Sequence, residues 1–186
     1  HYIIANGFKG EKYMEGLTDL IQDGFNVVPI LDNKRELDKY QSILGKKQNI
    51  NIGIRIASEE EPSFEFYTSR LGIRHADILD YYKTDIKPHK NVKLNMLHFF
   101  INTGIKDTTY YWTELLKALR IYCKLKKVCP ELEGLNIGGG LPFKNSLGFE
   151  FDYEYMIEQI VAQIKEYCNS KGVEEPHLFT EFGSYT

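Results

Sequence analysis

The sequence of 186 residues lacks the features of several classes of protein. No apolar run approaches the roughly 20 residues that a membrane-spanning helix needs, so no membrane partner is expected. Lys and Arg form no cluster, and 26 acidic residues against 23 basic ones give a net charge of −3. Because binding to a phosphate backbone requires a basic patch, nucleic acid is not an expected partner either.

Cysteine and histidine are too scarce and too scattered to indicate a metal site. The three cysteines, Cys123, Cys129 and Cys168, form no CxxC pair and fit no zinc spacing. The histidines do not cluster along the chain. A sparse, odd set of cysteines is typical of reduced thiols, which predicts a cytoplasmic protein.

The two ends of the sequence lie inside apolar segments. The chain begins at His1, without a Met, directly before the apolar run 2–5, and it stops at Thr186, shortly after an expected strand. Natural domains seldom begin and end inside packed strands, because unpaired strand edges would be exposed. We therefore expect a fragment of a longer protein.

Short apolar runs alternate regularly with longer amphipathic segments. The runs are β-branched or aromatic and apolar on consecutive positions, which is typical of strands that are buried on both faces. The six expected strands are residues 2–5, 26–31, 50–57, 92–99, 134–137 and 177–180.

The segments between the runs show helical spacing with start and stop signals. The first expected helix ends at Gly24 and carries Tyr13, Met14, Leu17, Leu20 and Ile21. The second is capped by Asn33 and ends at Gly45, and a weaker third helix lies around 76–83. The fourth is capped by Asp107 and ends before Pro130, and the fifth is capped by Asp152 and has Ile157, Ile160, Val161, Ile164 and Cys168 on one face. Strands that alternate with helices predict an α/β fold with a parallel sheet. That sheet is either open and doubly wound or a (β/α)8 barrel with two strands missing.

In both architectures ligands bind at the carboxyl ends of the strands, and polar groups stand there. The expected exits carry Asn6, Asp32, Arg55, the segment 98–104, the run Gly138-Gly139-Gly140 and Glu181. Three glycines allow bare N–H groups to approach a phosphate, although a plain flexible turn would also use them. The spacing fits neither the GxGxxG fingerprint nor a Walker loop, and a phosphate site after a late barrel strand fits better.

Five short motifs follow one another along the chain. They are Asn6-Gly7-Phe8-Lys9; Arg55-Ile56 with Arg70-Leu71-Gly72; His98-Phe99-Phe100-Ile101-Asn102-Thr103-Gly104; Asn136-Ile137-Gly138-Gly139-Gly140-Leu141; and Glu181-Phe182-Gly183-Ser184. In this order they resemble the pyridoxal-phosphate decarboxylases of the alanine-racemase-like barrel fold, which act on ornithine, diaminopimelate or arginine. The family's own versions include Lys-Phe-Gly, His-Phe-His-x-Gly-Ser, Asp-Ile-Gly-Gly-Gly-Leu and Glu-x-Gly-Arg.

The resemblance implies a pyridoxal 5'-phosphate site at these strand ends. The cofactor-binding residues that it implies are Arg55, Phe100, Thr103, Gly138, Gly139, Gly140 and Glu181. Glu181 would keep the pyridine nitrogen protonated, Arg55 would support the cofactor and Glu181, and Thr103 would bind the phosphate. Phe100 stands where the family has a histidine that stacks on the cofactor, and Ser184 where it has a phosphate-binding arginine.

The resemblance also implies what the chain contains. Residues 1–186 would be a partial pyridoxal-phosphate-binding (β/α)8 barrel domain, with the first strand and a C-terminal β-domain outside the chain. The Schiff-base lysine would lie upstream of His1, so Lys9 would not be that lysine and no catalytic residue is expected here. The fragment alone is therefore expected to be inactive.

The function implied for the full-length parent is the decarboxylation of arginine to agmatine in polyamine biosynthesis. Its partners would be a small amino-acid substrate and further copies of itself, in a homodimer or a larger homo-oligomer. Three alternatives remain open: a non-catalytic, decarboxylase-like binding or regulatory protein, which Phe100 and Ser184 favour; a decarboxylase of the diaminopimelate or carboxynorspermidine type; and an unrelated phosphate-binding barrel enzyme.

Overall fold

The computed structural model describes residues 1–45, 47–58, 71–101, 108–139 and 152–181. Its centre is a sheet of six parallel strands, and all six strands expected from the sequence are present within two residues of their expected ends. They are β1 (Ile3–Ala5), β2 (Val27–Leu31), β3 (Ile50–Arg55), β4 (Val92–His98), β5 (Gly134–Asn136) and β6 (His177–Phe179).

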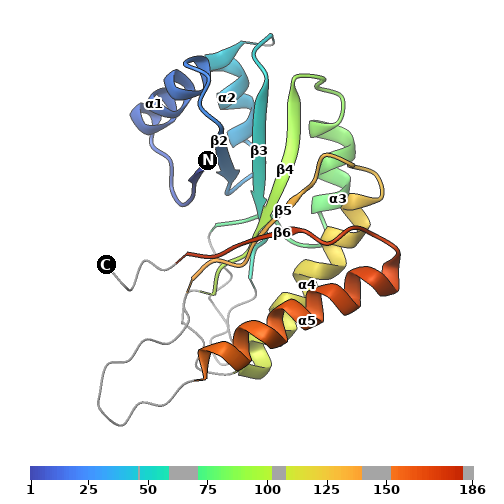
Figure 1. The fold of residues 1–186 in the computed structure, drawn as a ribbon. Coiled ribbons are helices and arrows are strands. Elements are labelled where there is room, and N and C mark those ends of the chain that lie inside the picture. Colours follow the sequence, from blue (N-terminus) through green and yellow to red (C-terminus); the bar gives the residue numbers. More distant parts are fainter. Residues whose placement is uncertain (46, 59–70, 102–107, 140–151, 182–186) are drawn as a thin grey trace, which may run out of the picture.

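The strands lie in the sheet in their sequence order, β1 to β6, and each pairs in parallel with its neighbours. A doubly wound sheet would reverse its strand order at one point. The doubly wound alternative is therefore wrong, and the partial (β/α)8 barrel is confirmed. Figure 1 shows the curved sheet with its helices around it, α1 beside α2 and α4 beside α5.

The helices begin and end close to the signals in the sequence. They are α1 (Glu11–Gln22), α2 (Glu36–Leu44), α3 (Ile78–Tyr81) with the π-helical turn η1 (Tyr82–Ile86), α4 (Thr108–Lys126) and α5 (Tyr153–Lys171). Asp152 caps α5 as predicted, because its Oδ1 accepts a hydrogen bond of 2.9 Å from the N–H of Tyr155. The other expected cap, Asp107, lies outside the described residues. None of the described helices is long and apolar enough to cross a membrane.

Two local predictions were wrong. Asn33 does not cap α2: its Oδ1 accepts from the N–H of Arg35 at 3.0 Å, so it closes a turn just before the helix begins at Glu36. In α5 the inner stripe begins at Met156 rather than Ile157, whose side chain is 45% exposed. Residues 156, 160, 164 and 168 repeat every four positions, and this row faces the core.

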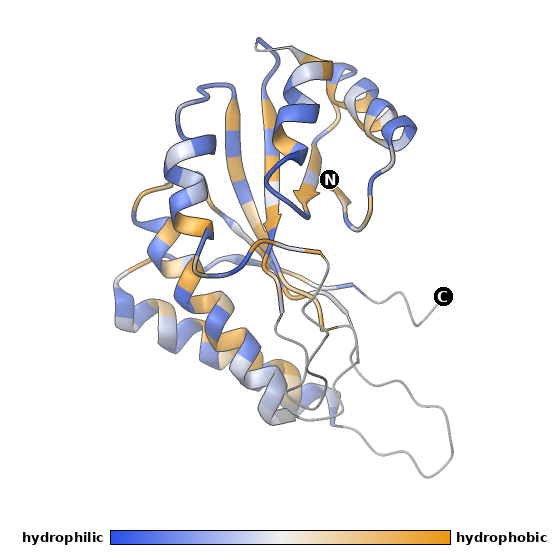
Figure 2. Cartoon of the chain, turned by 180° about the vertical axis from the view of Figure 1, so that it is seen from behind, coloured by the Kyte–Doolittle hydropathy of each residue, from blue (hydrophilic) through white to orange (hydrophobic). Residues whose placement is uncertain are grey.

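The apolar residues form two separate clusters. The larger one fills the space between the sheet and the helices, and Figure 2 shows hydrophobic strands beside helices of alternating character. The smaller cluster lies on the other face of the sheet, inside the barrel, where Val28, Ile30 and Met96 are fully buried and pack against Ile4 and Phe179.

Two glycines make room for this inner cluster. A Cβ atom at Gly53 would collide with the side chain of Ile30, and one at Gly134 would lie 3.1 Å from Cε of Met96. Glycine in a strand often marks such a close approach. We call this inner cluster the apolar floor of the half-barrel. It depends on two positions, Gly53 and Gly134, that carry no side chain.

Candidate functional site at the carboxyl ends of the strands

A layer of polar side chains stands directly above the apolar floor. Side chains two positions apart in a strand point to the same face, so the residue two positions beyond each floor residue also points into the barrel. The pairs are Ile4 and Asn6, Ile30 and Asp32, Gly53 and Arg55, Met96 and His98, Gly134 and Asn136, and Phe179 and Glu181. We call the second members of these pairs, Asn6, Asp32, Arg55, His98, Asn136 and Glu181, the polar layer.

Glu181 is the acceptor at the centre of this layer. Its Oε1 accepts hydrogen bonds from Nδ2 of Asn6 and, at 2.8 Å, from Nδ2 of Asn136, and it lies 3.9 Å from Nδ1 of His98. Its backbone N–H donates to the carbonyl oxygen of Gly138 at 2.9 Å. The side chain is 38% exposed, and Oε2 accepts no hydrogen bond from the described residues. Two amides therefore hold one oxygen, while the other has no hydrogen-bond donor among the described residues.

Arg55 is the cation that faces this carboxylate. Its NH1 lies 3.8 Å from Oδ1 of Asp32, and its guanidinium carbon lies 5.6 Å from the centre of the Phe100 ring. Burial lowers the pKa of Arg55, while the charges of Asp32 and Glu181 act in the opposite direction. An arginine keeps its proton in such surroundings. The structure thus brings together three residues that the sequence nominated separately, Arg55, Phe100 and Glu181.

Lys9 belongs to a buried ion cluster that shares Asp32 with Arg55. Its Nζ donates to Oδ2 of Asp32 at 2.8 Å and to the carbonyl oxygen of Gly7 at 2.6 Å, and it lies 3.3 Å from Oε2 of Glu36. Burial raises the pKa of Glu36. The ammonium group is enclosed by acceptors, which supports the expectation that Lys9 is not the lysine that carries the cofactor.

This cluster was not predicted from the sequence, although a signal for it was present. Lys9 and Asp32 follow two expected neighbouring strands. The carboxyl ends of parallel neighbours meet at one edge of the sheet, so a lysine and an aspartate there are natural partners.

His98 is buried and neutral. Burial, with the nearby charges of Arg55 and Lys9, lowers its pKa to about 3, while hydrogen bonding with Asn136 acts in the opposite direction. Its Nδ1 has no hydrogen-bond partner in the part of the chain that the structure describes. The interpretation of His98 as a structural residue stays a prediction.

The glycine run begins as a fixed, packed turn. Gly138 has a φ of +68°, and a Cβ atom there would lie 2.8 Å from the carbonyl oxygen of Phe99. A Cβ atom at Gly139 would lie 2.5 Å from the carbonyl oxygen of Glu181. The N–H of Gly138 donates to Oδ1 of Asn136 at 2.8 Å. Backbone from β4 and β6 thus approaches this turn as closely as glycine allows. Gly140 and Thr103 lie outside the described residues.

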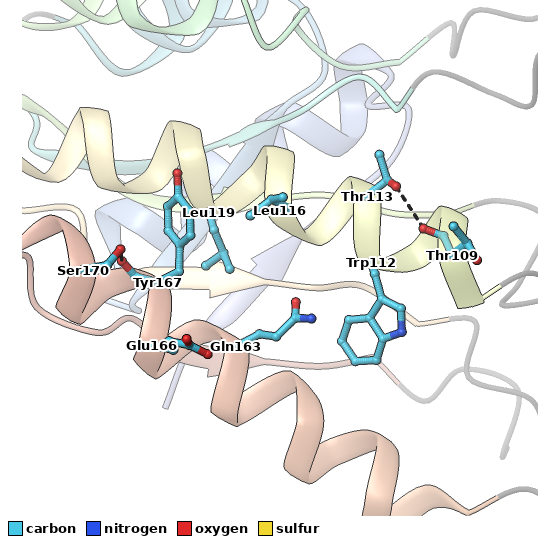
Figure 3. Close-up of a pocket in the computed structure, with 9 residues that line it drawn as sticks. All are labelled: Thr109, Trp112, Thr113, Leu116, Leu119, Gln163, Glu166, Tyr167 and Ser170. Atoms are coloured by element: carbon cyan, nitrogen blue, oxygen red, sulfur yellow. Dashed lines mark hydrogen bonds between the residues drawn. The ribbon is translucent and has the colours of Figure 1, made fainter.

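A cavity of about 540 Å³ lies elsewhere, between α4 and α5 (Figure 3). Trp112 and Leu116 from α4 face it from one side, and Gln163 and Tyr167 from α5 from the other. No residue of the polar layer lines it, so it is separate from the strand-end site.

A curved, all-parallel sheet that gathers its polar side chains at the carboxyl edge defines a ligand-binding domain of the (β/α)8 barrel class. The chain belongs to the pyridoxal-dependent decarboxylases, because the family model of their pyridoxal binding domain matches residues 3–186. The family and the cofactor inferred from the sequence, pyridoxal phosphate, are thereby confirmed. The assignment of single residues to the cofactor stays a prediction.

Individual relatives agree with the family. The chain is 28% identical over 197 residues to the biosynthetic arginine decarboxylase of Trichlorobacter lovleyi, covering 99% of the chain and 31% of that protein. The structure of the biosynthetic arginine decarboxylase of Campylobacter jejuni matches 97% of the chain and 30% of its own chain, with a TM-score of 0.77 and 24% identity. Lysine decarboxylase from Selenomonas ruminantium matches 96% of the chain and 43% of its own chain, with a TM-score of 0.70 and 23% identity. The chain therefore spans about a third of the length of the curated relative.

Proposed function

We propose that the chain is the cofactor-binding barrel of an enzyme that decarboxylates L-arginine to agmatine. The observation that carries the proposal is the state of Glu181 in a pyridoxal-binding barrel: two amides hold Oε1, and Oε2 is left to a ligand at the mouth. Arginine is the proposed substrate because the curated relative described above is named a biosynthetic arginine decarboxylase. A role in polyamine biosynthesis rests on the same similarity.

The residues at the mouth fit pyridoxal phosphate. When bound, the cofactor accepts the electron pair that departing carbon dioxide leaves behind, and it does so best with a protonated ring nitrogen. Glu181 would hold that proton through Oε2, because a carboxylate beside a ring nitrogen favours its charged form. Gly138 and Gly139, together with Gly140 and Thr103, would hold the phosphate through N–H and hydroxyl groups.

Arg55 and Phe100 would complete the protein side of the site. The guanidinium of Arg55 lies between Asp32 and the Phe100 ring, and Glu181 also contributes to its electrostatic surroundings. From there Arg55 would limit the build-up of negative charge near Glu181. Phe100 would present an aromatic face to the cofactor ring.

Phe100 is also the observation that favours a second candidate, a non-catalytic, decarboxylase-like binding protein. A phenylalanine has no group that can donate or accept a proton, and its ring already contacts Arg55. A diaminopimelate or carboxynorspermidine decarboxylase would keep the same barrel and differ in substrate. We further propose that the parent is a cytoplasmic homodimer or larger homo-oligomer, in which segments beyond residues 1–186 supply the cofactor lysine and a C-terminal β-domain.

The test is a decarboxylation assay on the full-length parent. Release of labelled carbon dioxide is measured from arginine, ornithine, lysine and diaminopimelate, with cofactor occupancy measured in parallel. Glu181→Gln should lower turnover on arginine by on the order of 10²–10³ while the cofactor stays bound, because one electrostatic contact in a partly dry site is lost. Glu158→Gln, on the exposed face of α5, is the control. Preference for another amino acid overturns the substrate, and near-full activity of Glu181→Gln overturns the role of Glu181.

A further inference from the structure

The side chain of Asn136 makes two different hydrogen bonds at once. Its Oδ1 accepts from the backbone N–H of Gly138 at 2.8 Å, and its Nδ2 donates to Oε1 of Glu181 at 2.8 Å. The N–H of Gly138 needs an acceptor, which fixes the oxygen of the amide on that side. The nitrogen must then face Glu181. One half of this buried amide holds the glycine turn and the other half holds the carboxylate.

Asn6 reaches the same carboxylate oxygen from the opposite end of the sheet. It follows β1, whereas Glu181 follows β6, and its Nδ2 donates to Oε1 of Glu181. Its Oδ1 is buried and has no hydrogen-bond partner among the described residues. Burying an unsatisfied amide oxygen is unfavourable. The bond to Glu181 is therefore the one polar contact that the Asn6 amide makes within the described structure.

We propose that Asn6 and Asn136 are positioning residues that hold Glu181 by one oxygen, so that the other oxygen meets the ring nitrogen of the cofactor. This inference rests on the proposed function of Glu181. Two N–H donors on one carboxylate oxygen select one orientation of the side chain. Oε2 accepts no hydrogen bond from the described residues.

The amide of Asn136 is what allows one side chain to serve both partners, an N–H donor and a carboxylate. An aspartate could still accept from the N–H of Gly138, but it would turn a second carboxylate oxygen toward Glu181. Two carboxylates that share one site cannot both remain ionised at little cost. The asparagine replaces that repulsion with a hydrogen bond.

Asn136→Asp separates the two roles of the amide, because it keeps the shape and the acceptor for Gly138 and removes the donor to Glu181. The variant is made in the full-length holoenzyme, with Asn6→Ala as a second variant that leaves the glycine turn intact. Asn49→Asp adds the same charge at an exposed position before β3 and is the matched control. Glu181→Gln is the reference for loss of the carboxylate.

The main readout is the protonation state of the cofactor ring nitrogen, followed by ¹⁵N NMR of cofactor labelled at that nitrogen. In Asn136→Asp and Asn6→Ala the signal should move from the protonated toward the neutral position, as in Glu181→Gln. Turnover on arginine should fall about tenfold to a hundredfold with KM nearly unchanged, because a hydrogen bond to a charged group is lost. Asn49→Asp should match the wild type in both measurements.

The outcomes separate the inference from the proposed function. If Glu181→Gln leaves the ring nitrogen protonated, the role of Glu181 fails and the inference fails with it. If Glu181→Gln shifts the signal but Asn136→Asp and Asn6→Ala do not, the inference alone is overturned. A shift in Asn6→Ala supports the inference even where Asn136→Asp does not fold.

Discussion

The ammonium group of Lys9 lies 2.8 Å from Oδ2 of Asp32, and neither side chain has any surface exposed to solvent. Glu36 completes the arrangement with a carboxylate oxygen 3.3 Å from the same ammonium group. Removing one member of a buried ion pair leaves a charge without a partner in a medium that solvates it poorly. The cluster is therefore sensitive to the loss of one charge.

Lys9→Met should lower the free energy of unfolding by about 3–5 kcal/mol, measured by urea denaturation. The double variant Lys9→Met/Asp32→Asn should recover part of the loss, because the stranded carboxylate is then neutral. The control is Lys34→Met, which breaks a pair with Asp77 whose side chains are 51% and 48% exposed. Exposed pairs are worth less than about 1 kcal/mol. Equal losses for Lys9→Met and Lys34→Met would contradict the buried cluster.

Gly139→Ala should weaken cofactor binding in the parent. The added Cβ atom would lie 2.5 Å from the carbonyl oxygen of Glu181, so the backbone that carries Glu181 must move. Gly16→Ala is the matched control, because a Cβ atom at this position in α1 meets nothing within 4 Å. That change should stabilise the helix by up to about 1 kcal/mol. Fluorescence titration with pyridoxal phosphate measures the effect, and equal affinity in both variants would refute the close approach.

His98 should make the fold less stable in acid. Its pKa is about 3 in the folded chain against an ordinary 6.5, so below pH 6.5 the unfolded chain binds a proton that the folded chain does not. Stability is therefore lost as the pH falls from 6.5 toward 3, by at most about 1.4 kcal/mol per pH unit, and His98 contributes no slope above 6.5. His98→Gln should reduce the difference between the unfolding free energies at pH 7.5 and 5.5. An unchanged difference would mean that His98 takes up a proton equally readily in the folded and the unfolded chain.

The three free cysteines should not react in the folded protein. Burial raises the pKa of Cys123, Cys129 and Cys168, the last to about 12, and the sulfurs of Cys123 and Cys168 lie 4.0 Å apart between α4 and α5. Since the thiolate is the reactive form, Ellman's reagent at pH 8 should label none of them until the chain is unfolded in guanidinium. Rapid labelling of Cys123 and Cys168 in the native chain would show that α4 and α5 separate.

The six strands could be predicted because each is a short segment with apolar residues between two helical patterns, and the segments end within two residues of the observed strands. The face of β4 could not be predicted in this way. Val92 and Leu94 point toward the helices, so simple alternation would place Met96 and His98 there too. A register shift between β3 and β4 skips Asn95, which turns Met96 into the barrel and His98 into the polar layer.

The sequence named Asn6, Arg55 and Glu181 as strand-exit residues but gave no sign that Asn6 and Glu181 touch. They are 175 positions apart, and they meet because the sheet curves far enough to bring the ends of β1 and β6 together. Curvature depends on packing inside the barrel, including Gly53 and Gly134, and periodicity does not report it. The hydrogen bond from Asn136 to Glu181 could not be predicted for the same reason.

The apolar floor also determines from which side a ligand can reach the polar layer. Ile30 and Met96 lie beneath the polar layer with no exposed surface, and both would have to be displaced by anything that passed along the barrel axis from the amino ends of the strands. Packing alone therefore blocks the passage of a ligand from the amino ends of the strands. Among the described residues, the polar layer is therefore open to a ligand from the carboxyl edge of the sheet and closed from the amino edge.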